Sequence, residues 1–251
     1  MKRIIINADD FGINSVVTSE IERMIEGGAV SSTTVMANGA CLKEVARFVK
    51  SHSEVSFGVH LCLSEFDSIT KSEVLYHAGL TNKAGSFIHK AIFRCNNLDR
   101  DEVKKAIRDE LNAQIDVVSS LGFKISHADS HHHVHTIWPL RDVIASVLKE
   151  RGIERVRLGG DYTSWRMKAH VVGWIRRVKL NKFYREHFKT TNGFYSYNEY
   201  VNANNPQEDV VELMCHPGHP GTKYREEMES VVAKTALIAP DVKLISYNEL
   251  Y

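Results

Sequence analysis

Short apolar runs alternate with amphipathic stretches along this chain. The runs that predict strands lie at residues 3–7, 32–36, 55–60, 125–128, 155–158, 210–215 and 242–245. Helical periodicity predicts helices at residues 16–26, 42–50, 99–121, 139–151 and 224–238, and Gly or Pro follows most of them, as expected at helix ends. Strands that alternate with helices in this way indicate a parallel sheet covered by helices.

Two segments break the alternation. Residues 64–98 are long, polar and weakly periodic, which predicts an inserted loop or lid, and residues 165–200 start with a helical pattern and then become irregular. The length of 251 residues suits one α/β domain over residues 1–251. We therefore predict a single-domain (β/α) barrel of eight strands or fewer, with an open doubly wound sheet as the alternative.

The composition limits which binding partners and which cellular compartment we expect. Lys and Arg total 32 against 31 Asp and Glu, a formal charge of +1, so no overall field attracts nucleic acid or an anionic membrane. The basic stretch 176–182 is interpreted as a solvated helix face. The apolar run at the start stops at Asn7, too early for a signal peptide, and no stretch is long enough to span a membrane. Four separated cysteines suit a reducing compartment, so we expect a soluble cytoplasmic protein.

Side chains that can bind a metal or transfer a proton follow four of the predicted strands. These are Asp9 and Asp10 after the first strand, His60 after the third, His131 within the histidine-rich stretch 127–135, and His216 after the strand at 210–215. The carboxyl ends of parallel strands meet at one edge of the sheet, so these residues are expected to converge in space.

Each of these residues also has a purely structural interpretation: a helix cap for the acids, a core position for His60, adventitious metal affinity for the histidine run, a rigid turn for His216. Four independent coincidences at the same strand-end position make that interpretation less economical. Two histidines and a carboxylate form a common catalytic metal site. A second carboxylate beside the cation stays ionised and can accept a proton from the water that the metal activates. One Asp would then bind the metal and its neighbour would be the base.

Four motifs in order along residues 3–218 resemble the YdjC-like carbohydrate deacetylases, a family that includes chitooligosaccharide deacetylases. They are "NADDFG" at 7–12, "GVHLCL" at 58–63, "HADSHHHVH" at 127–135 and "MCHPG" at 214–218. The resemblance implies a deformed (β/α) barrel with mainly parallel strands and its active site at the C-terminal strand ends. It also implies a metal-dependent hydrolase that removes the acetyl group from an N-acetylated amino sugar or short oligosaccharide, such as diacetylchitobiose, and releases acetate.

The resemblance also implies roles for individual residues. Asp10, His60 and His131 would bind one divalent ion, Mg or Zn, Asp9 would be the catalytic base, and His216 would donate a proton to the leaving amine. The order of the two acids follows the similar NodB-type deacetylases, and the exchange of Asp9 with Asp10 is the alternative. His127 or Asp129 would hold a ligand histidine in its orientation.

Other residues near predicted strand ends are candidates for sugar binding, although core packing explains them equally well. They are Phe11, Asn38, Trp138, Arg157, Asp161 and Tyr162. Residues 64–98 would cover the sugar. Two other functions fit the same residues: a metal-dependent phosphoesterase on the same barrel and a non-catalytic metal-binding protein. A small carbohydrate is the expected partner, and a homodimer is compatible with a chain of this size.

Overall fold

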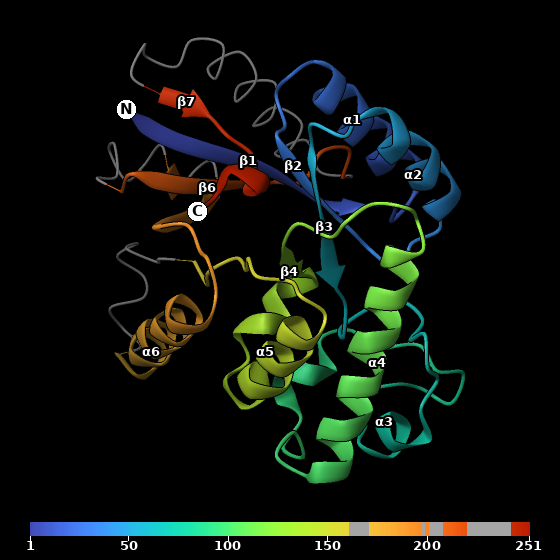
Figure 1. Cartoon of the computed structure of the whole chain (residues 1–251). Helices are drawn as coiled ribbons and strands as arrows, with labels where there is room; N and C mark the ends of the chain where they lie inside the picture. Colours follow the sequence, from blue (N-terminus) through green and yellow to red (C-terminus); the bar gives the residue numbers. More distant parts are fainter. Residues whose placement is uncertain (161–170, 197–198, 201–207, 220–241) are drawn as a thin grey trace.

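Parallel strands form one curved sheet in the computed structural model, which describes residues 1–160, 171–196, 199–200, 208–219 and 242–251 (Figure 1). The strands of the described part are β1 (Lys2–Phe11), β2 (Ser32–Val35), β3 (Ser56–Leu61), β4 (Ala128–Ser130), β5 (Gly193–Ser196), β6 (Val210–Cys215) and β7 (Val242–Leu244). Their order is β4-β3-β2-β1-β6-β5, and β7 pairs with the first residues of β1. Every pairing is parallel.

The sheet curls toward closure beyond its outer strand β4. An isolated parallel bridge joins Ala128 of β4 to Val156, and a second joins Arg155 to Lys189 in the chain that leads into β5. These bridges continue the sheet from one edge strand toward the other without regular strands between them. The predicted α/β fold, a deformed barrel of parallel strands, is therefore confirmed.

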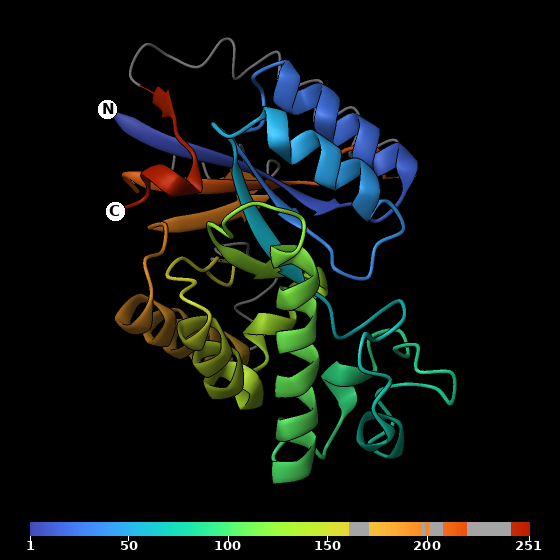
Figure 2. The same cartoon turned by 45° about the vertical axis from the view of Figure 1, so that its right-hand side comes forward.

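Helices cover the outside of this sheet (Figures 1 and 2). They are α1 (Ser15–Glu26), α2 (Leu42–Phe48), α3 (Glu73–His77), α4 (Asp101–Ser119), α5 (Arg141–Glu150) and α6 (Val171–His187), with 3-10 turns at Val49–Ser51, Ala91–Arg94, His131–Thr136, Trp138–Leu140 and Tyr247–Glu249. Helices α1 and α2 lie together beside the β1–β2 part of the sheet, and α4 packs on α5 (Figure 2). Among the described helices, none has an apolar stretch long enough to cross a bilayer.

The local sequence explains why α1 begins where it does. The Asn14 side chain accepts a hydrogen bond of 3.0 Å from the backbone N–H of Val17, which satisfies one of the free donors at the helix start. Val17, Ile21 and Met24 recur at helical spacing and are buried against the sheet. Asn14 is therefore the cap of α1, which leaves Asp9 and Asp10 without a capping role.

Strand boundaries differ from the sequence predictions in several places. β1 extends through Asp9 and Asp10, which lie within the strand rather than after it. The strand predicted at 125–128 begins only at Ala128, and residues 155–158 contribute isolated bridges. β5 was not predicted, and it lies in a part of the chain whose sequence pattern is irregular. The strand has only four residues and polar residues flank it, so it leaves no clear apolar pattern. The helix predicted at 224–238 lies outside the described residues.

Segment 64–98 is anchored on α4 by two buried polar side chains. The carboxylate of Glu110 accepts hydrogen bonds from the backbone N–H groups of Ile69 and Thr70, both at 2.9 Å, and from the hydroxyl of Thr70 at 2.7 Å. Gln114 bonds both backbone groups of Cys62, where the segment leaves β3. Buried residues of the segment, Leu75, Leu80, Phe87, Ile92 and Leu98, join the main core. The segment is therefore a packed element, and α3 lies beside α4 (Figure 1).

Candidate metal centre and active site

A bulge at the end of β1 directs two neighbouring carboxylates into one cluster. The β1–β2 register shifts between Ala8 and Phe11, and Asp10 has a φ of +69°. Successive side chains of a regular strand point to opposite faces, and a bulge changes the direction of a side chain. Asp is one of the residue types that adopt the left-handed conformation most readily. Asp9 and Asp10 are each 1% exposed, so both carboxylates need partners inside the protein.

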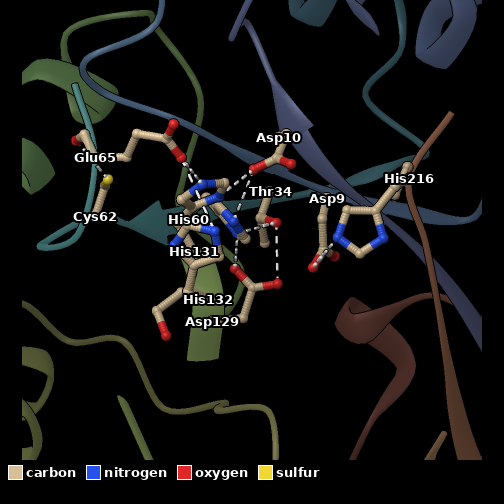
Figure 3. A network of polar contacts seen from close by, with 12 residues as sticks. Asp9, Asp10, Thr34, His60, Cys62, Glu65, Asp129, His131, His132 and His216 are labelled. Atoms are coloured by element: carbon tan, nitrogen blue, oxygen red, sulfur yellow. Dashed lines mark hydrogen bonds and ion pairs between the residues drawn. The ribbon is translucent and has the colours of Figure 1, made fainter. Parts of the chain in front are cut away.

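Asp10 contacts two histidines through one oxygen (Figure 3). Its Oδ1 lies 3.0 Å from His60 Nε2 and 2.8 Å from His131 Nδ1. Its Oδ2 lies 2.9 Å from His219 Nε2, and both atoms are buried without a regular hydrogen bond. Burial raises the pKa of Asp10, but the neighbouring His60, His131 and His219 outweigh it and hold that pKa well below its usual value.

Both histidines direct their second ring nitrogen at another carboxylate. His60 Nδ1 lies 2.6 Å from Asp129 Oδ1, whose other oxygen accepts a hydrogen bond of 3.0 Å from the Thr34 hydroxyl. His131 Nε2 lies 3.2 Å from Glu65 Oε2 (Figure 3). Histidines that bind metals usually have their other nitrogen held in this way, which fixes the ring orientation.

The three side chains of Asp10, His60 and His131 therefore fit a divalent metal ion. They offer one oxygen and two nitrogen atoms, all within 4.8 Å of one another, and all three residues are buried. The buried Asp10 Oδ2 that has no hydrogen-bond partner is a further donor atom toward a cation. Two histidines and a carboxylate leave coordination positions open for water and substrate.

Asp9 is held by a different cation, the guanidinium of Arg157. Nη1 and Nη2 of Arg157 donate to the two oxygens of Asp9, each at 2.6 Å, and Arg157 has no exposed surface. Burial raises the pKa of Asp9, but the charge and hydrogen bonds of Arg157 outweigh it and lower that pKa strongly. Asp9 is thus ionised at neutral pH and fixed in orientation by a bidentate pair.

The same guanidinium contacts two further carboxylates. Nη1 lies 2.8 Å from Asp129 Oδ2, and Nε donates to Glu212 Oε1 at 2.8 Å. Three buried carboxylates around one cation leave excess negative charge. Burial is the main cause that raises the pKa of Glu212 to about 7, so this residue takes up a proton most readily.

Asp9, His60 and Asp129 form another group with metal-ligand spacing. Arg157 already supplies the positive charge there, and His60 Nδ1 is used by Asp129. The position beside Asp10 is therefore the better place for an ion.

His216 faces Asp9 from the end of β6. Its Nε2 lies 3.8 Å from Asp9 Oδ2, and 23% of its side chain is exposed (Figure 3). Burial lowers the pKa of His216 more than the carboxylates of Asp9 and Asp10 raise it, so the imidazole is neutral at pH 7. The structure thus brings together all five residues that the sequence predicts for metal binding and catalysis: Asp9, Asp10, His60, His131 and His216.

Of the two residues predicted to hold a ligand histidine, Asp129 contacts His60 and His127 contacts neither His60 nor His131. The ring of His127 stacks on Tyr247 at 3.8 Å between centroids, and its Nε2 lies 2.9 Å from Asn7 Oδ1. Asn7 in turn donates to Asp9 Oδ1 at 3.0 Å. His127 therefore supports Asp9 through Asn7.

The predicted sugar-binding residues separate into three groups. Phe11 and Arg157 have no exposed surface, so they pack and pair inside the protein rather than face a substrate. Asn38 donates to the backbone oxygen of Asp67 in segment 64–98 at 3.1 Å, and the ring of Trp138 packs on Arg141. Asp161, like Tyr162, lies outside the described residues.

Several residues that contact the site were not predicted from the sequence. Thr34 and Glu65 carry no distinctive sequence signal, because each reaches the site only by contacting a residue far along the chain. Glu212 did carry one: it is a lone carboxylate in the apolar run 210–215, and a buried charge requires a partner. His219 lies three residues after His216 in the same turn.

Comparisons with known proteins show the family and the fold of this chain. A family model described as "YdjC-like protein" matches residues 3–243. A protein of Oceanobacillus iheyensis named "Carbohydrate deacetylase" is 34% identical over 86% of this chain and 85% of its own. A "Chitooligosaccharide deacetylase" of Klebsiella pneumoniae is 30% identical over 61% of this chain and 58% of its own. A crystal structure from Enterococcus faecalis, whose name refers to cellobiose-phosphate cleavage, shares the fold with a TM-score of 0.76 at 24% identity, over 99% of this chain and 98% of that one.

Proposed function

The chain belongs to the YdjC-like protein family, and from this membership we propose that it is a metal-dependent carbohydrate deacetylase. It would hydrolyse the acetamide of an N-acetylated amino sugar or short oligosaccharide and release acetate. The names of the two deacetylase relatives support this class of reaction. The observation that carries the proposal is a buried metal-binding set next to a separate carboxylate, Asp9, that Arg157 keeps ionised.

Asp10, His60 and His131 would hold one divalent ion. When bound, such an ion lowers the pKa of a water molecule and stabilises the negative charge that develops on the amide oxygen. Imidazole ligands favour zinc and other transition metals, whereas magnesium prefers oxygen ligands, so both zinc and magnesium have to be tested.

Asp9 is the proposed acceptor of the proton from the attacking water. Arg157 fixes both of its oxygens, which orients the carboxylate but also makes it a weak base. His216 Nε2 lies only 3.8 Å from Asp9 Oδ2, and its imidazole is neutral before the reaction. Asp9 would pass the proton that it accepts from the water to His216, and His216 would then protonate the amine as the bond to the acetyl group breaks.

Segment 64–98 is proposed to cover the sugar during the reaction. It begins three residues after the end of β3, which carries His60, and Glu65 of this segment contacts His131. Four free cysteines support a cytoplasmic location, where thiols stay reduced. The homodimer that the chain length allows stays a prediction, which light scattering coupled to gel filtration would test.

The deciding experiment measures acetate release from N,N′-diacetylchitobiose by the purified protein, before and after chelation, with zinc and magnesium added back separately. Release that chelation abolishes and one ion restores is the expected result. Phosphate release from an aryl phosphate without acetate release would favour a phosphoesterase instead. Bound metal with neither product would indicate a non-catalytic metal-binding protein.

A further inference from the structure

A second group of metal-binding side chains lies next to the Asp10–His60–His131 set. It consists of Glu65 at the start of segment 64–98, His89 near its end and His132 in the 3-10 turn after β4. Glu65 Oε1 lies 3.8 Å from His89 Nδ1, and Glu65 Oε2 lies 3.9 Å from His132 Nε2. Both separations are too long for hydrogen bonds.

The ring of His132 is oriented by a contact on its other side. Its Nδ1 lies 2.9 Å from the Ser64 hydroxyl, which directs Nε2 toward Glu65. The ring of His89 meets the ring of His132 edge-on, with centroids 5.3 Å apart. A metal-binding histidine usually has one ring nitrogen held by the protein and the other directed at the ion.

The backbone adopts a left-handed conformation at one of the three candidate ligands and directly after the other two. Positive φ angles occur at Phe66 (+64°), directly after Glu65, at Lys90 (+54°), directly after His89, and at His132 itself (+51°). Side chains of this size rarely adopt the left-handed conformation, and such residues cluster at functional sites. The left-handed residues thus lie at or next to the three candidate ligands, which come from two separate parts of the chain.

We propose that Glu65, His89 and His132 form a second divalent-cation site, specific for zinc and similar transition metals. Zinc bonds of about 2.0–2.1 Å in a tetrahedron separate neighbouring ligand atoms by about 3.4 Å. The two Glu65 contacts, one through each carboxylate oxygen, exceed this spacing by only about 0.5 Å, and one ligand atom from each of the three residues lies within 4.8 Å of the others. Side chains of His89 and Glu65 are 62% and 38% exposed, so their ends can make this adjustment. Two imidazoles disfavour magnesium and calcium.

An ion in this site would join both ends of segment 64–98 to the histidine-rich turn. The same Glu65 carboxylate lies 3.2 Å from His131 Nε2, so the second site adjoins the first through one side chain. Occupancy is expected to restrict the motion of the segment. The inference rests on the side chains of this second group and does not depend on the proposed deacetylase activity.

The test is a zinc titration of the metal-free, full-length protein against a chromophoric chelator, with metal content measured after gel filtration. Wild-type protein is expected to bind two equivalents, and His89→Ala and His132→Ala one each. The matched control is His77→Ala, which removes another exposed histidine of segment 64–98, on α3, and should keep both equivalents. His131→Ala should lose the first equivalent and keep the second.

Amide hydrogen exchange supplies a readout that does not depend on stoichiometry. The second equivalent of zinc should slow exchange in residues 64–98 of wild type and of His77→Ala, and leave it unchanged in His89→Ala. One equivalent bound by the wild type, and still bound by both His89→Ala and His132→Ala, would overturn the proposal. Two equivalents retained by both His89→Ala and His132→Ala, with the same exchange pattern as wild type, would show an adventitious ion only.

Discussion

Asp9 and Asp10 are adjacent in sequence, yet the structure gives them different neighbours, so replacing Asp9 by Asn should separate catalysis from metal binding. Both Asp9 oxygens are 2.6 Å from the guanidinium of Arg157, whereas Asp10 contacts His60 and His131. An Asn at position 9 keeps the shape of the side chain and removes its charge and its capacity to accept a proton. We expect Asp9→Asn to retain the metal ion and lose turnover.

The size of both effects can be worked out from these contacts. Asn presents an N–H group to one of the two Arg157 donors, so one charge-assisted hydrogen bond is lost, which costs about 1.5–3 kcal/mol. Asp129 and Glu212 still neutralise Arg157, and a domain has about 5–15 kcal/mol of stability, so the variant should fold. A missing general base lowers the rate by about 10²–10⁴-fold. This loss corresponds to about 3–5 kcal/mol in the activation free energy.

The assay compares acetate release and metal content of Asp9→Asn with those of wild type and of Asp109→Asn. Asp109 is an exposed residue of α4 that pairs with Lys105, so its replacement controls for a generic Asp-to-Asn change. Loss of the ion from Asp9→Asn would refute the assignment and exchange the roles of the two acids. An intact ion with activity within about tenfold of wild type would place the base elsewhere, with His216 as the remaining group.

Three further replacements test the metal ligands, the buried Glu212 and the anchor of segment 64–98. His131→Ala should remain folded, lose the first equivalent of metal and lose activity; full activity with the ion retained would contradict the ligand set. Glu212→Gln tests a pH dependence: burial raises the pKa of Glu212 from 4.5 to about 7, so the folded state holds a proton that the unfolded state releases. As pH rises from about 4.5 to about 7, the free energy of unfolding of the wild type should therefore fall by on the order of 3 kcal/mol relative to that of Glu212→Gln, measured by denaturant unfolding. Parallel curves of unfolding free energy against pH for the two proteins would contradict the assignment. Glu110→Gln weakens three hydrogen bonds that anchor segment 64–98, so it should speed proteolysis in that segment and raise KM several-fold with a smaller change in kcat; unchanged proteolysis would show that the anchor lies elsewhere.

Hydrophobic periodicity predicted much of the fold, because it reflects local backbone geometry. The strand at 210–215 matches β6 residue for residue, and the end of α1 at Glu26 falls where the glycine pair predicts it. The rule that parallel strands end at one edge then predicted that Asp10, His60 and His131 would meet. These inferences need only the order of residues and the spacing of apolar positions.

The different neighbours of the two acids were decided only by the tertiary structure. A β-bulge with a left-handed Asp10 directs that carboxylate toward the histidines, and no local pattern predicts it. Arg157, 148 residues away from Asp9, supplies the cation that holds this carboxylate. Glu65 and Asp129 orient histidines that lie 66 and 69 residues from them in the chain. Such partners cannot be predicted from spacing, because electrostatic pairing acts through space between groups that only the folded chain brings out of water together.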